Sequence, residues 1–302
     1  MFVVFLTGVY NSMKHHVLYN AKAGHGDSEQ KARALSDFYQ GDVLFREISE
    51  IKDYGEFFAS IAPDDTVTIC GGDGTLNCFI NATDGIDIPN DILYFAIGTG
   101  NDFLRDIGKT DAEKPFSVKK YMRNLPTVAI NGKSYRFLNN VGFGIDGYCC
   151  EVGDRIKATS TKPVNYTAIA IKGLLFHYKP TNATICVDGK TYRYKKVWLA
   201  PTMKGRFYGG GMMPTPAQNR MAEDGTLSLL LFYGKGSLPT LIAFPSIFKG
   251  EHIKHKSMVA VHEGKDITVT FDKPSTIQID GETIVGVTSY RAVAKAPVPS
   301  AQ

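Results

Sequence analysis

The chain has 302 residues, of which 43% are hydrophobic and 21% charged, so it can build one large or two ordinary globular domains with buried cores. No apolar run reaches the roughly 18 residues that a membrane-spanning helix needs. The net charge of +4 is too small to indicate nucleic-acid binding, but it suits a protein that meets a nucleotide or an anionic membrane surface.

Both ends of the chain are expected to be loose, over residues 1–13 and 296–302. The apolar start has no basic residue before it and is therefore a poor secretory signal, so Met13 is expected to be the natural start. The last residues, AVAKAPVPSAQ, are small or proline and bury little. The five cysteines show no CxxC pair, which favours reduced thiols in a cytoplasmic protein over a metal site.

Residues 14–129 alternate strand and helix signals. Apolar runs at His16–Tyr19, Thr66–Cys70 and Ile92–Ile97 each end at a turn of small and polar residues, and a helix signal follows each turn. This order is typical of parallel βαβ units, in which ligands bind at the carboxyl ends of the strands. The segment is therefore predicted to be an α/β nucleotide-binding domain with a parallel sheet.

Residues 130–287 show a different pattern, with short alternating runs and the turn dipeptides Asn131-Gly132, Asp188-Gly189 and Asp280-Gly281. They predict a mostly antiparallel β-sandwich domain that binds lipid, and the chain is expected to return to the first domain at about 288–295. Two helical segments, Tyr166–Tyr178 and Ser237–Phe248, interrupt the strands.

The loop Gly71-Gly72-Asp73-Gly74-Thr75 carries the strongest chemical signal. Adjacent glycines let the backbone approach a phosphate, and the amides at the start of the next helix form an anion site. Asp73 can hold Mg²⁺ beside the phosphates, and Thr75 can cap the helix. The loop is neither a Walker A motif nor a GxGxxG turn, because the required Lys and third Gly are missing.

Two further polar turns follow neighbouring strands, at Asn20–Gly24 and at Gly98–Asp102. Three such turns at one edge of a sheet favour a nucleotide cleft over three unrelated turns. Taken alone, Gly98–Asp102 is equally well explained by an N-capped helix start.

Together these motifs resemble the diacylglycerol kinase catalytic-domain family, and most of all its bacterial lipid kinases, which are also similar to sphingosine kinases. The resemblance runs from Lys14 to Arg291. It rests on Asn-x-x-Ala-Gly, Gly-Gly-Asp-Gly-Thr-Leu-Asn, Gly-Thr-Gly-Asn-Asp-Phe and a late Asp-Gly-Glu, with further matches at Tyr208–Gly211, Pro216-Ala217, Glu223–Gly225 and Gly250–His252.

The resemblance implies a two-domain fold with ATP between the domains, Glu282 as general base, Asp73 as the second catalytic residue, and a structural Mg²⁺ at Asp224 with the carbonyls of Met221 and Thr226. The residues expected to bind the nucleotide are Asn20, Ala21, Lys22, Ala23, Gly24, Gly71, Gly72, Gly74, Thr75, Leu76, Asn77, Thr99, Asn101 and Asp102.

The sequence departs from the family pattern at two positions. Ala21 replaces a proline, which should loosen the first turn, because proline fixes φ. Asn131 stands where related kinases can carry an Asp that pairs with basic residues near the first motif. Without the resemblance, Glu282 is more simply explained as a solvated turn residue.

These observations predict a cytoplasmic ATP- and Mg²⁺-dependent kinase that phosphorylates a hydroxyl of a membrane lipid such as diacylglycerol, in phospholipid biosynthesis. Apolar Ser237–Phe248, followed by basic residues, suits transient membrane contact, although a core helix explains it equally well. Alternatives are a NAD kinase, which shares the glycine loop, and a non-catalytic regulator that binds nucleotide or lipid. No nucleic-acid partner is expected, and a homodimer is left open.

Overall fold

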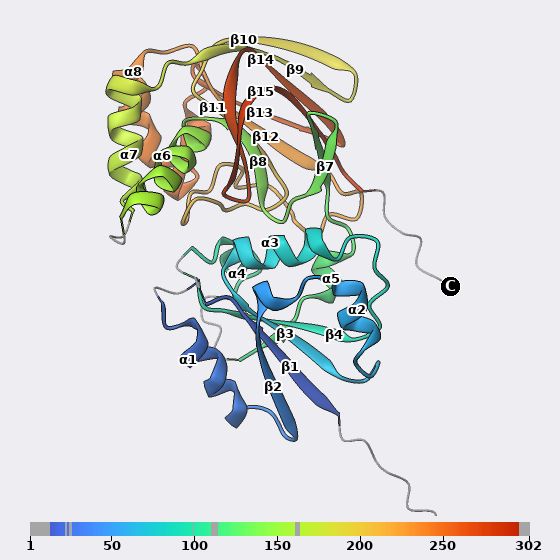
Figure 1. The fold of residues 1–302 in the computed structure, drawn as a ribbon. Coiled ribbons are helices and arrows are strands. Elements are labelled where there is room, and N and C mark those ends of the chain that lie inside the picture. The colour runs from blue at the N-terminus through green and yellow to red at the C-terminus, as the bar shows by residue number, and fades with distance from the viewer. Residues whose placement is uncertain are drawn as a thin grey trace, which may run out of the picture.

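The computed structural model describes residues 13–21, 23, 26–98, 100–109, 114–160 and 164–295. Lys22, Gly24 and Thr99 of the expected nucleotide site lie outside the described residues, as do both terminal segments except Met13. Two sheets lie one above the other, and the blue and cyan half of the chain forms the first of them (Figure 1).

The first sheet has five strands in the order β2-β1-β3-β4-β5, and all pairs are parallel except β4 with β5. Its central strands are almost completely buried, as expected for a parallel sheet covered on both faces. The strands are β1 (Lys14–Tyr19), β2 (Asp42–Glu47), β3 (Thr66–Gly71), β4 (Asp91–Ala96) and β5 (Phe116–Ser117).

Helices cover both faces of this sheet and leave the carboxyl ends of β1, β3 and β4 facing the second sheet (Figure 1). Leu76, Phe79 and Ile80 on one face of α3 pack with Val67 and Ile69 of β3 in one buried cluster. The helical segments are α1 (Ser28–Arg33), η2 (Ala34–Asp37), η3 (Ile48–Glu50), α2 (Tyr54–Ala59), α3 (Asp73–Ala82), α4 (Asp102–Asp106) and α5 (Lys119–Met122).

The second sheet is antiparallel and has ten strands, with the path β13-β12-β11-β8-β14-β15-β6-β7 and a branch in which β9 pairs with β10 and β14. The predicted fold class, an α/β part followed by an antiparallel β-sandwich-like part, is confirmed. The strands are β6 (Thr127–Ile130), β7 (Lys133–Arg136), β8 (Asn140–Gly144), β9 (Thr181–Val187), β10 (Lys190–Val197), β11 (Leu199–Met203), β12 (Leu227–Phe232), β13 (Val259–Gly264), β14 (Asp266–Ile279) and β15 (Glu282–Val293).

The hairpin turns follow from the sequence. Asn131, Asp188 and Asp280 have φ values of 50°, 47° and 47°, and the glycine after each is also positive. Asn and Asp tolerate this left-handed region and Gly has no penalty there, so these dipeptides close two-residue hairpins. The end of β15, residues 291–293, pairs with β6 inside the second sheet. The boundary at 129/130 and the return at 288–295 stay predictions.

Helical segments gather on one flank of the second sheet, where α6, α7 and α8 lie side by side (Figure 1). A separate core that includes Ile145, Trp198 and Phe232 fills the space beneath them. Within the described residues, no helix has both the length and the hydrophobicity to cross a bilayer. The segments are α6 (Ile145–Thr159), α7 (Tyr166–Lys172), the π-helical η4 (Gly173–His177), α8 (Ser237–Ala243), η5 (Phe244–Lys249) and η6 (Glu251–Lys254).

Candidate active site

The glycine loop joins β3 to α3 at the carboxyl edge of the first sheet. Gly72 is the N-cap of α3, and its missing side chain leaves the first helical amides without a side-chain cap. α3 has ten residues, so its N-terminus carries the partial positive charge of a full helix. This geometry fits the phosphates of a nucleotide, which are the natural ligands of such an end.

The loop after β4 lies directly against the glycine loop. A Cβ added to Gly98 would lie 2.6 Å from the Cα of Gly72, so only glycine permits this approach. Asn101 has φ 32° and precedes α4, and its Oδ1 is buried with no hydrogen-bond partner among the described residues. The two loops therefore form one surface with an unused polar acceptor.

The loop after β1 is joined to the glycine loop by a side-chain contact. Asn20 Nδ2 donates to Oγ1 of Thr75 over 2.9 Å, and the backbone amide of Asn20 donates to the carbonyl of Cys70. Ala23 closes a turn by donating to the carbonyl of Asn20, while exposed Ala21 lies 3.4 Å from Oε1 of Glu47. The loops after β1, β3 and β4 thus converge at one edge of the sheet.

Asp73 is partly buried, and within the described residues only one of its two carboxylate oxygens is hydrogen-bonded. Its Oδ2 accepts the backbone amide of Phe103 and Nδ2 of Asn139, each over 2.9 Å. Its Oδ1 is buried and has no hydrogen-bond partner in the described part of the chain. Burial raises the pKa of Asp73, against the lowering effect of those donors. A buried, unpaired carboxylate oxygen fits a cation, since buried polar groups normally have partners.

Asp102 shows the same asymmetry. Its Oδ2 accepts the amide of Gly210 over 2.8 Å, and its Oδ1 has no partner among the described residues. Burial raises the pKa of Asp102 to about 7, and the nearby charge of Asp73 contributes in the same direction. Gly210 lies in the Tyr208–Gly211 turn of the second domain, so Asp102 reaches across the domain boundary.

Asp280 and Glu282 flank the turn between β14 and β15 but have different environments. Asp280 is deeply placed and accepts four hydrogen bonds, from Nδ2 of Asn77 and from the amides of Leu138, Asn139 and Asn140. Burial raises the pKa of Asp280 to about 6. Glu282 is exposed, and its Oε1 lies 4.0 Å from the place of a Cβ on Gly74. It therefore faces the glycine loop.

Two residues expected to bind the nucleotide have side chains that contact other parts of the protein. Leu76 is completely buried in the first core, and its amide donates to the carbonyl of Gly72. Asn77 is buried, and its Nδ2 donates to Asp280 and to the carbonyl of Arg136. Neither side chain faces the loop surface, because on α3 both project toward neighbouring elements of the protein.

The expected metal site at Asp224 lies on the surface. Thr226 donates to its carboxylate through the amide (3.1 Å) and the hydroxyl (2.6 Å), and these bonds lower the pKa of Asp224. Lys265 Nζ lies 3.8 Å away, and the carbonyl of Thr226 accepts Nε2 of Gln218. The carboxylate is thus satisfied within the protein, while Met221 is half-exposed. The metal site stays a prediction.

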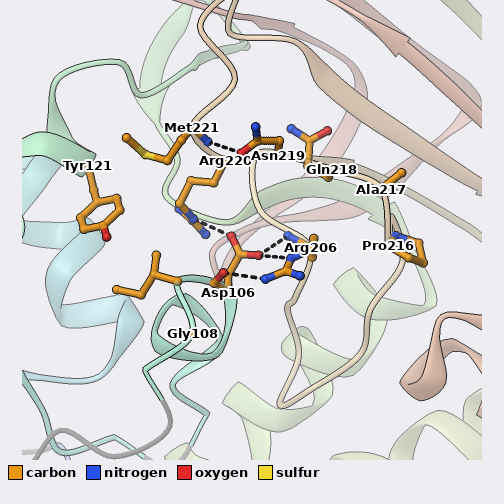
Figure 2. A pocket seen from close by; sticks show the side chains of 11 residues that line it. Asp106, Gly108, Tyr121, Arg206, Pro216, Ala217, Gln218, Asn219, Arg220 and Met221 are labelled. Carbon is orange, nitrogen blue, oxygen red and sulfur yellow. Dashed lines mark hydrogen bonds and ion pairs between the residues drawn. The ribbon is translucent and has the colours of Figure 1, made fainter.

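A cavity of about 600 Å³ opens at the domain boundary beside α4 and α5, away from the glycine loops. At its base Asp106 lies between Arg206 and Arg220 (Figure 2). The side chains of Asp106 and Arg220 are only 2% and 5% exposed. No sequence motif marks these residues or Asn139, because they contact one another and Asp73 across 66 to 114 positions of the chain.

Other asparagine details agree with the fold rather than with a relay. Asn131 occupies the first position of the turn between β6 and β7 and is exposed. An asparagine at this turn has no carboxylate to pair with basic residues near the loop after β1.

Comparison with known proteins gives two matches that together span most of the chain. Residues 14–129 match the model of the diacylglycerol kinase catalytic domain, and residues 139–297 match the YegS C-terminal NAD kinase beta sandwich-like domain. The second match alone covers more than half of the chain.

Individual relatives are distant. A Mycobacterium tuberculosis diacylglycerol kinase is 27% identical over 63% of this chain, which spans 62% of that protein's length. A Staphylococcus aureus protein whose name includes the words lipid kinase is 28% identical over 72% of this chain and 70% of its own.

The fold is also similar to a solved structure. A Bacillus anthracis protein whose name includes the words diacylglycerol kinase superimposes with a TM-score of 0.64 at 20% identity, over 97% of this chain and 95% of its own. At this identity the likeness concerns the fold. The two family matches decide the classification: the chain belongs to the diacylglycerol kinase catalytic-domain family, with a YegS-type C-terminal domain.

Proposed function

We propose that this kinase transfers the γ-phosphoryl group of ATP to a hydroxyl of a membrane lipid, with diacylglycerol as the first candidate acceptor. ATP use follows from the family. The observation that carries the finer proposal is that Glu282, from the second domain, faces the uncapped N-terminus of α3 in the first. A base and a phosphate site thus meet at the domain boundary.

In this proposal the first domain binds the phosphates of the nucleotide and the cation. ATP supplies the phosphoryl group when bound, and Mg²⁺ beside it offsets the negative charge of the phosphates. The amides at the start of α3 are positioned to bind phosphate oxygens. The open Oδ1 atoms of Asp73 and Asp102 are the groups of this chain best placed to hold the cation. They are preorganised, because each aspartate is anchored by its other oxygen.

The proton side of the reaction falls to Glu282. A hydroxyl that attacks phosphorus loses its proton, and a nearby carboxylate can accept it. The side chain of Glu282 is exposed beside Gly74 and accepts no hydrogen bond from the described residues. Asp280 is a poorer base, since four donors already use its oxygens.

The acceptor side is supported by an apolar surface on the helical flank. Phe176 and Ile242 are each 74% exposed and Leu238 is 62% exposed, although α8 packs against η4. Single exposed apolar residues are ordinary, but a group on packed neighbouring helices is typical of an interaction surface. Lys172, Lys249 and Lys254 are exposed on the adjoining segments α7, η5 and η6, which favours an anionic bilayer.

The decisive test of the activity is transfer from labelled ATP. The protein is incubated with total bacterial lipid extract, with pure diacylglycerol, or with NAD, and the products are separated. A labelled lipid supports the proposal, and labelled NAD instead would establish the NAD kinase alternative. ATP binding without any transfer would leave a non-catalytic regulator as the better description.

The membrane surface is tested separately by vesicle sedimentation. Phe176→Ser combined with Ile242→Ser should weaken binding to vesicles that contain anionic phosphatidylglycerol by about tenfold, since burying apolar area contributes about 25 cal/mol per Å². Leu44→Ser, on an exposed position of β2, is the matched control. Binding should also fall with salt, because screening shortens the reach of the lysines. Equal binding of the double variant and the control would contradict this surface.

A further inference from the structure

Arg220 is connected to Asp73 by two short contacts through Asn139. Arg220 Nη2 donates to Oδ1 of Asn139 over 2.6 Å, and Nδ2 of Asn139 donates to Oδ2 of Asp73 over 2.9 Å. All three side chains are buried or nearly so, and no exposed group intervenes. The chain of contacts runs from the second domain into the glycine loop of the first.

Arg220 also contacts the ring of Phe103, the residue that provides the other donor to Asp73. Its guanidinium carbon lies 4.9 Å from the centre of the Phe103 ring, and the amide of Phe103 is the second donor to Oδ2 of Asp73. Both residues that anchor Asp73 are therefore in contact with the same guanidinium, Asn139 through its side-chain amide and Phe103 through its ring. The open oxygen, Oδ1, is the one that neither donor uses.

The chemistry of the guanidinium fixes the direction of these bonds. Arginine has five donors and no acceptor, so only the carbonyl oxygen of Asn139 can face it. The amide NH₂ of Asn139 must then face Asp73, where it is needed as a donor. The backbone of Asn139 is held by Asp280 and by the amide of Lys204, so the only remaining freedom is rotation of the side chain.

Arg220 is itself held rigidly at the base of the cavity in Figure 2. Its Nε donates to Oδ2 of Asp106 over 2.7 Å and its Nη1 to the carbonyl of Leu138 over 2.6 Å. Arg206 binds the other oxygen of Asp106 but has a side chain that is 37% exposed. The two arginines thus share a carboxylate, and only Arg220 continues toward Asp73.

We propose that Arg220 is a positioning residue, which orients the Asn139 amide so that Asp73 presents its Oδ1 to the phosphate side. The proposal rests on the proposed function of Asp73. Without Arg220, the Asn139 amide can turn over, and its oxygen would then face the carboxylate. Asp73 would lose a donor and rotate away from its working orientation.

Steady-state kinetics test this with Arg220→Lys, which keeps the charge but cannot donate to Asp106, Leu138 and Asn139 together. We expect kcat to fall about 10- to 100-fold, as for other residues that orient a ligand-holding group, with KM for ATP changed by less than about threefold. Arg206→Lys is the matched control and should stay within about threefold of the wild type, because it does not touch Asn139.

A double-variant cycle separates positioning from general destabilisation. If Arg220 acts through Asn139, adding Arg220→Lys to Asn139→Ala should reduce kcat no further. Additive losses, or a loss that follows the fraction unfolded at the assay temperature, would overturn the proposal. If Arg220→Lys does not fold, Asn139→Ala and Asn139→Leu carry the test, and wild-type kcat in either would equally overturn it.

A measurement that does not depend on turnover can separate the positioning role of Arg220 from the function of Asp73. In protein labelled with ¹⁵N-asparagine, the side-chain amide of Asn139 should exchange slowly with solvent in the wild type and in Arg206→Lys, and quickly in Arg220→Lys. Unchanged exchange in Arg220→Lys would refute the positioning. Full activity of Asp73→Asn, together with the expected exchange, would instead refute the proposed role of Asp73.

Discussion

Asp73 and Asp280 lie on opposite sides of the domain boundary, and both bind the segment Leu138–Asn140 that enters β8. Asp280 has both oxygens occupied by four donors, whereas Asp73 has one oxygen anchored and one open. Burial raises the pKa of both carboxyls. The saturated carboxylate of Asp280 binds the segment that enters β8 and, through Asn77, the first domain, whereas the half-open carboxylate of Asp73 is the one that we propose binds a ligand.

The two domains contribute different kinds of group to the candidate site. The parallel sheet ends in loops whose amides and side-chain oxygens have unused capacity, at Gly72, Asn101 and Asp102. The antiparallel sheet presents Glu282 from the β14–β15 hairpin, next to the fully hydrogen-bonded Asp280. The candidate site is thus built from loops with open polar atoms on one domain and a hairpin on the other, and variants can test this difference.

The largest effect is expected from Asp73→Asn. An amide can keep the bonds from Phe103 and Asn139 but is a weak cation ligand, so kcat should fall by about 10³- to 10⁴-fold, the several kcal/mol that a catalytic metal supplies. The melting temperature should stay near that of the wild type, because the asparagine has the same shape as Asp73 and introduces no buried charge. Asp42→Asn, at an exposed site on β2, is the control. Near-normal turnover at saturating Mg²⁺ would contradict the metal role.

Glu282→Gln should lower kcat by about 10²- to 10⁴-fold, the usual contribution of a general base. The glutamine keeps the shape but cannot accept the proton, so the acidic limb of the pH-rate profile should flatten. ATP affinity should survive, since the phosphate loops lie on the other domain. Glu263→Gln on exposed β13 is the control. If only Asp280→Asn is inactive, the turn is correct and the residue is not.

Asp280→Asn should act mainly on stability. The new NH₂ would face two of the four donors, and each buried donor left unsatisfied costs about 1 to 3 kcal/mol of the free energy of unfolding. Urea denaturation measures this loss. Asp188→Asn is matched, because Asp188 has the same turn position but binds exposed amides of Lys265 and Asp266. Equal losses in the two variants would show that the four bonds of Asp280 stabilise the fold no more than the exposed bonds of Asp188.

The smallest effect concerns Asp102, whose pKa is raised by burial to about 7 in the folded protein. Its neutral form favours the fold, so its contribution is complete below about pH 4 and is lost as the pH rises through 7. Asp102→Asn cannot ionise, so the variant does not lose this stability as the pH rises. Without nucleotide or Mg²⁺, the melting temperature of the variant relative to the wild type should therefore be a few degrees higher at pH 8 than at pH 5. A pH-independent difference would contradict the shifted pKa.

Much of the fold could be predicted from local signals. Apolar runs that end in glycine turns gave the parallel strands β1, β3 and β4, and the Asn-Gly and Asp-Gly pairs marked three hairpins whose residues have positive φ. The helical interruptions were also found, although η4 and η5 are not α-helical. These features depend on residues that are close together in the sequence, so local sequence patterns predict them directly.

The site was harder to predict because its geometry depends on distant pairs. Motifs identified the glycine loop and the turn at Glu282, but not that Leu76 packs into a core or that Asn77 binds the second domain. Arg220 and Asp106 belong to no motif, and their contact requires the finished fold. A sequence pattern cannot show which oxygen of Asp73 is open, since both donors come from other elements.

The hairpin that carries Glu282 has a consequence for how the enzyme matures. Asp280 meets Asn77 across 203 positions of the chain, so Glu282, the proposed base, reaches the glycine loop only after β14 and the turn that follows it have been synthesised. The parallel sheet, made first, can fold while the ribosome is still adding β8 to β15. Such long-range closure is intrinsically slow. A nascent chain should thus acquire nucleotide binding well before it acquires turnover.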